Sequence, residues 1–201
     1  YNEAEFFPHS RPADTSAKES KRLCDLYDRY MPLKAVDITK ETESRYEVAL
    51  NACLNTIGRN RQIDALMPAD IQQMRVALIA TRTVSTVNHY LATFIGFLYW
   101  CEDNKYCEGL AKHCTRFTKS HKDPDPFTHA EYRALLDKGC LHPIDKAAVT
   151  LAFYTGLRPG ELCALALEDV SPDLSRLNVR RSITRSLTFK VPKTNKERTV
   201  L

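Results

Sequence analysis

The chain has 201 residues, 43% of them hydrophobic and 27% charged, with a formal net charge of +4, which allows one large domain or two small ones with modest cores. It contains no signal peptide and no long apolar run, so its composition excludes a membrane-anchored protein and favours the cytoplasm. The seven cysteines are odd in number and form no ordered framework, so we expect reduced core thiols and not a disulfide scaffold.

Residues 1–110 predict an extended entry followed by a small all-α domain. Residues 1–15 contain prolines and little periodicity, which indicates an extended segment. From residue 16 onward, apolar side chains recur at helical spacing, and we expect helices at about 16–31, 39–57, 68–78 and 85–104. Pro32 should end the first of these helices. Four helices with short connections within 16–110 predict a helical bundle.

The entry to the fourth predicted helix carries a group of polar side chains. They are Arg82, Ser85, Thr86, Asn88 and His89, and Asn88 and His89 are expected to fall off the apolar stripe of the helix. Residue types alone leave two interpretations open. The group either contacts DNA or forms the polar outer face of an ordinary capped helix.

Residues 111–126 predict a linker, because they combine four Lys or Arg with two X-Pro steps and lack apolar spacing. Cys101, Cys107, His113 and Cys114 lie close to it in sequence and have side chains that bind metals. They contain no Cys-x-x-Cys pair and fall on a helix end and the linker, so we expect no metal and no cofactor. The linker divides a domain of residues 16–110 from a second domain of residues 127–201.

The second domain holds the most informative stretch, a glycine-marked turn that carries Arg158. An apolar helix at about 143–154 leads to this turn, and a new helix starts directly after it. Pro159 suits the first helical position, and Glu161 falls in the first turn. Arg158 is thus placed at the positive end of a helix, where its guanidinium and backbone donors can converge on one anion. This favours a phosphate site over an arginine that only caps a loop.

The C-terminal part of the chain predicts strands and a basic hairpin. Residues 176–184, 187–191 and 198–201 alternate like strands. The last 26 residues carry eight Lys or Arg and one acidic residue, whereas residues 1–110 have a net charge of −2. A basic block is usually a solvated face, but this density on strand-like sequence favours a polyanionic partner. The basic segment 192–198 lies between two of the strands and is expected to form a hairpin tip that reaches into a groove.

Three of these stretches share one family resemblance. The turn reads Thr155-Gly156-Leu157-Arg158-Pro159-Gly160-Glu161-Leu162, with Leu165 and Asp169-Val170 after it. This string resembles the arginine motif of the tyrosine recombinases, the integrases of phages and integrative mobile elements. Residues 192–198 resemble the lysine hairpin of that family. Residues 87–91 look like the Thr/Val-x-Asn-x-x-Leu segment of its core-binding domain.

The resemblance implies roles for individual residues. Arg158 would bind the non-bridging oxygens of a DNA phosphodiester, because its planar fork donates two parallel bonds and keeps its charge. Lys193 falls at the general acid that protonates the leaving 5′ oxygen, and Lys196 is the competing candidate. Glu161 would orient the guanidinium, or it would act only as a helix N-terminal glutamate. The predicted DNA-contacting residues are Arg82, Ser85, Thr86, Asn88, His89, Arg181, Lys196 and Arg198.

The resemblance also implies a fold and a reaction. The fold would be mostly α, with a four-helix, SAM-like core-binding domain and a truncated α+β catalytic domain that has a small antiparallel sheet. Whole members of the family cleave and rejoin DNA through a 3′-phosphotyrosine, without metal or ATP, as tetramers on two DNA sites. The His-x-x-Arg segment and the tyrosine nucleophile are not found here, and Tyr154 is assigned to an apolar helix face. We therefore expect a piece of a longer protein that binds core-site duplex DNA as a monomer without cutting it.

Two other functions compete with this interpretation. A non-catalytic helical DNA-binding regulator would use the basic hairpin only to contact backbone phosphates. Both proteins would bind DNA with a steep salt dependence, so Arg158→Ala in a longer parent is the discriminating change. A regulator would lose a little affinity, whereas a recombinase would lose cleavage and still bind. A metal-dependent nuclease is disfavoured because no Asp/Glu/His cluster appears at ligand spacing.

Overall fold

The computed structural model describes residues 20–120, 123–184, 187–191 and 198–200. The chain divides into two compact units, residues 1–121 and residues 122–201, which we call the helical unit and the α/β unit. Their boundary falls within the segment 111–126, for which the sequence predicts a linker. In the described ranges, none of the helices combines the length and the apolar character needed to cross a membrane.

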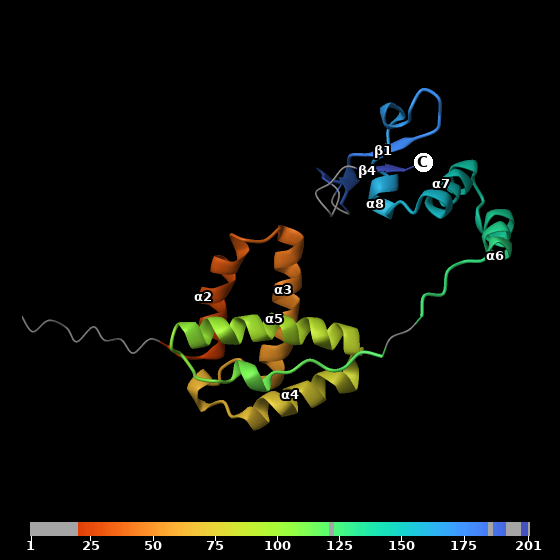
Figure 1. The fold of residues 1–201 in the computed structure, drawn as a ribbon. Helices are drawn as coiled ribbons and strands as arrows, with labels where there is room; N and C mark the ends of the chain where they lie inside the picture. The colour runs from red at the N-terminus through yellow and green to blue at the C-terminus, as the bar shows by residue number, and fades with distance from the viewer. Residues whose placement is uncertain (1–19, 121–122, 185–186, 192–197, 201) are drawn as a thin grey trace, which may run out of the picture. The chain divides into compact units, whose positions relative to one another are not determined.

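The helical unit contains the four helices that the sequence predicts (Figure 1). They are α2 (Leu23–Ala35), α3 (Lys40–Ile57), α4 (Pro68–Thr81) and α5 (Val84–Asp103), with short 3-10 turns η1 (Ile63–Ala65) and η2 (Ala111–His113). The prediction that Pro32 ends the first helix is wrong, since α2 continues to Ala35. Tyr30 and Met31, directly before the proline, are buried in the core. Proline lacks one backbone N–H, and here the helix continues for only three residues beyond it.

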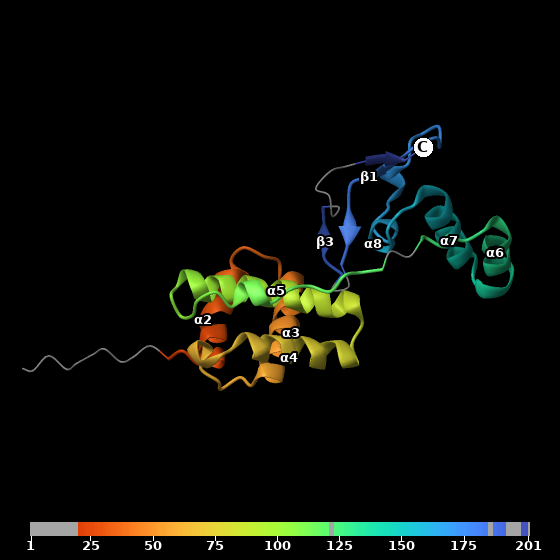
Figure 2. The ribbon, with the colours of Figure 1, turned by 60° about the horizontal axis from the view of Figure 1, so that its bottom comes forward.

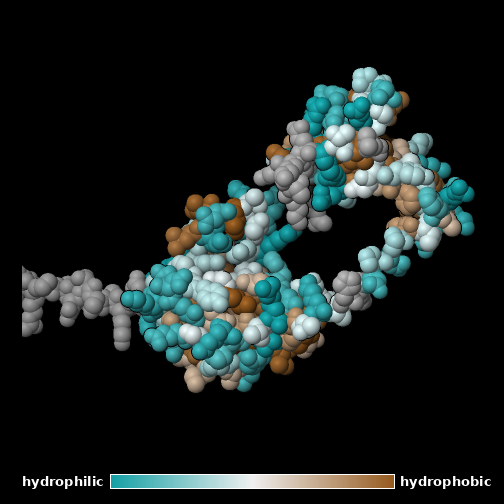
Figure 3. Space-filling model, viewed as in Figure 1, coloured by the Kyte–Doolittle hydropathy of each residue, from teal (hydrophilic) through white to brown (hydrophobic). Residues whose placement is uncertain are grey.

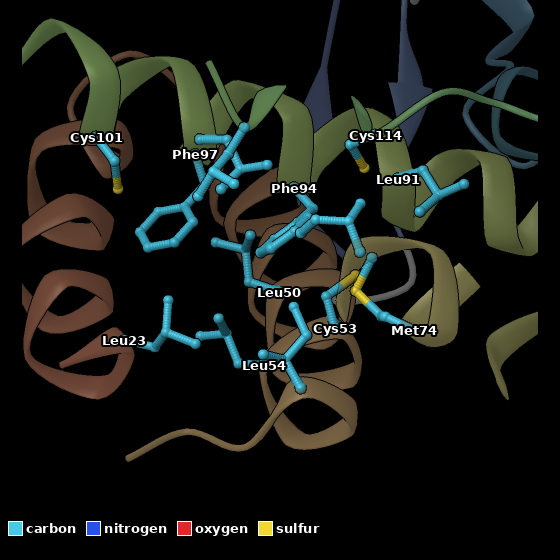
Figure 4. Packing of buried hydrophobic residues seen from close by; sticks show 14 of the residues in the cluster. Leu23, Leu50, Cys53, Leu54, Met74, Leu91, Phe94, Phe97, Cys101 and Cys114 are labelled. Carbon is cyan, nitrogen blue, oxygen red and sulfur yellow. The ribbon is translucent and has the colours of Figure 1, made fainter. Parts of the chain in front are cut away.

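The core of the helical unit is shared by all four helices. Figure 4 shows Leu23 of α2, Leu50 of α3, Met74 of α4 and Phe94 of α5 within one interior cluster, and all four side chains are buried. Such a contiguous cluster supplies most of the stabilisation of a small domain, at about 25 cal/mol for each Å² of apolar surface removed from water. The helices are therefore held by tertiary packing of their apolar stripes.

Cysteine thiols form part of this core, as expected. Cys53 and Cys101 are buried and unpaired in the structure. Burial raises the pKa of both thiols far above the ordinary value, because an apolar interior disfavours the thiolate. These side chains thus act as small hydrophobic residues.

The first part of the predicted linker packs on the helical unit. Ala111 and Cys114 belong to the buried core, and Phe117 lies partly buried against it. These residues follow one another at intervals of three, which is an apolar spacing that the basic composition of the segment conceals. The guanidinium of Arg75 lies 4.6 Å from the centre of the Phe117 ring and covers it from outside.

The α/β unit consists of short helices and two small antiparallel sheets (Figures 1 and 2). Its helical elements are α6 (His129–Ala134), the π-helical turn η3 (Leu135–Gly139), α7 (Pro143–Thr155), α8 (Pro159–Leu162) and the 3-10 turn η4 (Leu167–Asp169). Its strands are β1 (Leu177–Val179), β2 (Ser182–Ile183), β3 (Phe189–Lys190) and β4 (Arg198–Val200). β1 pairs with β4, and β2 pairs with β3. The run 176–184 is thus divided into two strands, because the chain changes its pairing partner after Val179.

Helix α7 packs on α6 through aromatic rings. The rings of Tyr132 and Phe153 are stacked with their centres 4.1 Å apart, and the Tyr132 hydroxyl lies 3.0 Å from Oγ1 of Thr150. The Tyr154 ring meets the Tyr132 ring edge-on, and 64% of the Tyr154 residue is exposed. None of the described residues of α7 is buried. On the face of the molecule seen in Figure 3, hydrophobic patches lie among hydrophilic residues. The assignment of Tyr154 to an apolar face therefore describes its ring contacts but not a buried position.

Candidate nucleic-acid interface

The Arg158 turn is shaped by two glycines. Gly156 ends α7 with φ of 61°, a left-handed conformation that a residue without a side chain adopts at little cost. Gly160 lies in α8, and a Cβ there would stand 2.6 Å from the carbonyl oxygen of Ile183 and 2.7 Å from Oγ of Ser182. Only glycine at position 160 lets strand β2 approach α8 this closely. The Arg158 turn therefore packs directly against the β2 backbone.

Glu161 lies at the centre of this site and is only 1% exposed. Its Oε2 accepts the backbone N–H of Arg158 at 2.9 Å, and its Oε1 accepts Nη1 of Arg158 at 3.0 Å. The guanidinium of Arg198 in β4 donates Nη1 to Oε1 at 2.9 Å and Nη2 to Oε2 at 2.7 Å. Each carboxylate oxygen thus joins both arginines.

The electrostatics of Glu161 follow from these contacts. The Arg198 guanidinium lowers the pKa of Glu161 to about 2, and the backbone N–H and guanidinium of Arg158 act in the same direction. Burial acts against them, because it disfavours the charged carboxylate. The carboxylate therefore stays ionised at neutral pH and keeps a fixed negative charge beneath the Arg158 turn.

Arg158 itself is placed between this carboxylate and solvent. One nitrogen of its guanidinium is bound to Glu161, while 51% of the side chain is exposed. An arginine held at one edge by a buried carboxylate can offer its remaining donors to an anion. The geometry suits the orienting role that the sequence suggests for Glu161, which stays a prediction.

Arg198 and Arg181, both predicted to contact DNA, are bound to buried carboxylates, and their contact with DNA stays a prediction. Arg198 is engaged with Glu161 through two nitrogens. Nη2 of Arg181 donates to Oδ2 of Asp169 at 2.7 Å and lies 2.8 Å from the Glu168 carboxylate. Burial alone would raise the pKa of Asp169, but the bonds from Arg181 and from the backbone N–H of Ala166 keep it below its usual value. Both arginines therefore tie the sheets to the α8–η4 segment.

Arg180 is a basic residue of this unit that the sequence analysis did not single out. Its Nε lies 3.8 Å from Oδ1 of Asp169, a buried oxygen that has no hydrogen-bond partner in the described part of the chain. A hollow of about 330 Å³ on the β1–β4 sheet is lined by Asn178, Arg180, Arg198 and Thr199. The clustering of basic residues at 176–198 was the sequence signal that could have pointed to Arg180 as a candidate site residue. Lys193 and Lys196, the candidates for the general acid, lie outside the described residues.

The helical unit carries a second basic hollow, of about 630 Å³, at the start of α5. It is lined by Ser85, Asn88, His89, Ala92, Arg116, Phe117 and Lys119. Nζ of Lys119 lies 3.1 Å from Oγ of Ser85, which joins the segment after the core to the helix. By composition, Arg116 and Lys119 belong to the predicted linker of residues 111–126. Their basic character was visible, but their packing beside α5 was not.

Asn88 does not lie on the outer face of α5, and the expectation that it falls off the apolar stripe is wrong. The residue is buried, its Nδ2 donates to the carbonyl of Phe117 at 2.8 Å, and its Oδ1 accepts the Phe117 N–H at 2.7 Å. Two backbone groups of an irregular segment are satisfied in this way, and such buried groups need partners. His89, the next residue, is exposed as expected.

The other residues of the predicted group have local roles as well. Thr83 is the N-cap of α5 and its hydroxyl accepts the backbone N–H of Thr86. The guanidinium of Arg82 lies 5.4 Å from the centre of the Tyr90 ring. In the described ranges, no three or more His, Cys, Asp or Glu side chains are grouped so that they could hold a metal ion. Cys101, Cys107 and Cys114, weighed above as ligands, are buried core residues.

Comparison with known proteins gives relatives but no matching family model. The putative defective protein IntQ of Escherichia coli strain K12 is 26% identical over 211 residues, which cover 96% of this chain and 52% of the relative. The prophage integrase IntR of the same strain is 30% identical over 194 residues, which cover 86% of this chain and 44% of the relative. The chain spans about half the length of the curated relatives it matches.

Solved structures share the fold. A lambda integrase tetramer bound to a Holliday junction matches 98% of this chain and 57% of its own, with a TM-score of 0.76 and 18% identity. The Tn1549 transposon integrase in complex with a circular intermediate DNA matches 90% of this chain and 61% of its own, with a TM-score of 0.71 and 15% identity. The predicted combination of a mostly α fold with small antiparallel pairings is thereby confirmed.

Proposed function

Because the chain belongs to the integrase family of tyrosine recombinases, we propose that it binds duplex DNA at recombination core sites. The helical unit and the Arg158 turn would each contribute contacts to the DNA backbone. In the longer protein, the proposed reaction is site-specific strand cleavage and rejoining through a 3′-phosphotyrosine. A non-catalytic DNA-binding regulator is the alternative.

The chemistry proposed for the α/β unit centres on Arg158. Its guanidinium would bind the non-bridging oxygens of the scissile phosphate and stabilise the charge that develops there. A well-placed arginine accounts for about 10³–10⁵ in rate in related phosphoryl transfers. Lys193 would protonate the departing 5′ oxygen. The observation that carries this proposal is the half-exposed Arg158 guanidinium held against the buried Glu161 carboxylate.

In the helical unit, the proposed contacts are those of the hollow beside α5. His89, Arg116 and Lys119 line it, and none of their side chains belongs to the core. Arginine and lysine side chains in such a hollow can neutralise backbone phosphates. Asn88 would support this surface from below by fixing Phe117, and we do not propose it as a direct contact.

The binding proposal is tested by titrating the purified chain into fluorescein-labelled duplex DNA at several salt concentrations between about 50 and 200 mM. The slope of log K against log salt is negative, and Arg116→Ala and Lys119→Ala should each make it less steep by about 0.9, the value for one phosphate contact. Lys40→Ala is the charge-matched control, because Lys40 is exposed at the start of α3 and does not line the hollow. A wild-type chain without salt-dependent binding, or equal losses in all three variants, would refute the interface.

The chemical proposal needs a second test. The 201-residue sequence has no tyrosine in the motif position of the nucleophile, so we propose that it forms no covalent adduct with nicked core-site DNA. A denaturation-resistant protein–DNA adduct would contradict this. In a longer parent, Arg158→Ala should abolish adduct formation and retain binding, whereas a regulator would lose only some affinity. We propose that the parent assembles as a tetramer on two sites and that this chain is a monomer, which light scattering checks.

A further inference from the structure

We propose that Arg198 is a positioning residue, which holds the Glu161 carboxylate in place so that Glu161 in turn fixes the Arg158 guanidinium. This inference rests on the proposed role of Arg158 as the phosphate-binding residue. It assigns to Arg198 a role different from the DNA contact that the sequence suggests.

The first support is the way the three side chains share their atoms. Oε1 of Glu161 accepts Nη1 of Arg158 and Nη1 of Arg198, while Oε2 accepts the Arg158 backbone N–H and Nη2 of Arg198. Both arginines reach both oxygens, but only the Arg198 guanidinium does so through two of its own nitrogens, in the two-bond geometry that fixes the plane of a carboxylate. Only one of the two Arg158 bonds comes from its guanidinium, the other being donated by its backbone N–H.

The second support is burial. Glu161 is 1% exposed, whereas Arg198 keeps 34% of its side chain in contact with solvent. A carboxylate in this position without Arg198 would be left with one guanidinium nitrogen and one N–H as partners. A buried charge that loses a partner rearranges toward whatever donor or water it can reach. Any such movement of the carboxylate would disturb the single bond between its Oε1 and Nη1 of Arg158.

The third support is the topology. Arg198 opens β4 and reaches back 37 residues to α8, and its strand partner is Val179 of β1. One ion pair therefore ties the start of β4 to the turn that carries Arg158.

Arg181 provides a matched control. Its guanidinium also binds a buried carboxylate from a strand region of the same unit, but that carboxylate is Asp169, which has no bond to Arg158. Arg181→Gln should therefore disturb the unit to a comparable degree without releasing Arg158. A difference between Arg198→Gln and Arg181→Gln separates positioning from general stabilisation.

The first readout is the side-chain ¹⁵N spectrum of the free chain, with the Arg158 signals assigned by their absence in Arg158→Ala. The separate Nη signals of Arg158, which report a guanidinium that rotates slowly, should be lost in Arg198→Gln and retained in Arg181→Gln. If Arg198→Gln does not fold, Arg198→Lys takes its place. Lysine keeps the charge but cannot make the two-bond contact, so the same loss is expected. Unchanged Arg158 signals in the folded variant would overturn the proposal.

The second readout is duplex binding in a double-mutant cycle. If Arg198 acts through Arg158, then Arg198→Gln should not change the salt slope further once Arg158 is alanine. If Arg198→Gln makes the salt slope less steep by a further 0.9 or about that in the Arg158→Ala background, Arg198 contacts a phosphate itself and the proposal is wrong. The spectra require no DNA. A wild-type chain that fails to bind duplex therefore refutes the proposed function, while the spectra still decide the role of Arg198.

Discussion

Replacing Glu161 with glutamine changes one atom and removes the charge that Arg158 and Arg198 share. The glutamine oxygen can still accept hydrogen bonds, but its NH₂ group faces donors where the carboxylate offered a second acceptor. We expect the α/β unit to lose stability at neutral pH, while the helical unit keeps its own. The change is informative because it leaves the volume of the side chain almost constant.

The pKa of Glu161 gives the magnitude. A fall from the usual value of 4.5 to about 2 corresponds to roughly 3 kcal/mol of stabilisation, at about 1.4 kcal/mol for each pKa unit. Arg158 and Arg198 are partly exposed, so water can solvate them once the carboxylate is gone. Removing one partner of a fully buried ion pair costs about 3–5 kcal/mol. The loss of stability in Glu161→Gln should therefore not exceed that range.

The pH dependence has a definite sign. The pKa of Glu161 is lower in the folded than in the unfolded chain, so its contribution is complete above about pH 4.5 and is lost as the pH falls toward 2. Wild type and Glu161→Gln should therefore differ most at neutral pH and converge in acid. This convergence distinguishes loss of the charge from a packing defect, which would persist at every pH.

Urea unfolding provides the assay, with the two units followed separately. Trp100 is the single tryptophan and lies in α5, so its fluorescence reports the helical unit and should not change. Hydrogen exchange of the β1–β4 amides reports the α/β unit. Glu168→Gln is the control, since its carboxylate is 64% exposed and its pair with Arg181 should contribute less than about 1 kcal/mol. Equal stability of wild type and Glu161→Gln at pH 7 would refute the reasoning.

Three further predictions concern other parts of the chain. Gly160→Ala should destabilise the α/β unit by about 1–3 kcal/mol in thermal unfolding followed by circular dichroism, because its Cβ would meet the β2 backbone. Asn88→Ala should cost about 2 kcal/mol in the Trp100 fluorescence transition, since two Phe117 backbone groups lose their partners. Unchanged midpoints would contradict either. In the folded chain, Cys163, which is exposed, should react with a thiol reagent well before Cys101, and mass spectrometry of labelled peptides measures the order.

Features with a strong local period could be predicted from the sequence. The four helices of the first unit follow from apolar stripes, and the strands at 176–200 follow from alternation. The start of α8 at Pro159 follows from proline placement alone. In each case the sequence signal lies within a few residues along the chain, even though β1 and β4 pair across about twenty residues.

Features that depend on distant partners could not be predicted. Asn88 looked like a surface residue because its partner, Phe117, is 29 residues away on a segment with linker composition. The ion pair of Arg198 with Glu161 was not expected, because a basic residue in a basic block gives no sign of a carboxylate 37 residues upstream. The residue type specified what each side chain could bind, but only the fold specified which partner it meets.

The separation of Glu161 and Arg198 along the chain also has a consequence during synthesis. A ribosome that adds 5–20 residues per second needs roughly 2 to 7 s to translate the 37 residues between them. Throughout that interval the nascent carboxylate has only Arg158 and water as partners. The helical unit precedes both residues, and its core can condense during the delay. We therefore expect the α/β unit to close after the helical unit, once β4 has emerged from the exit tunnel.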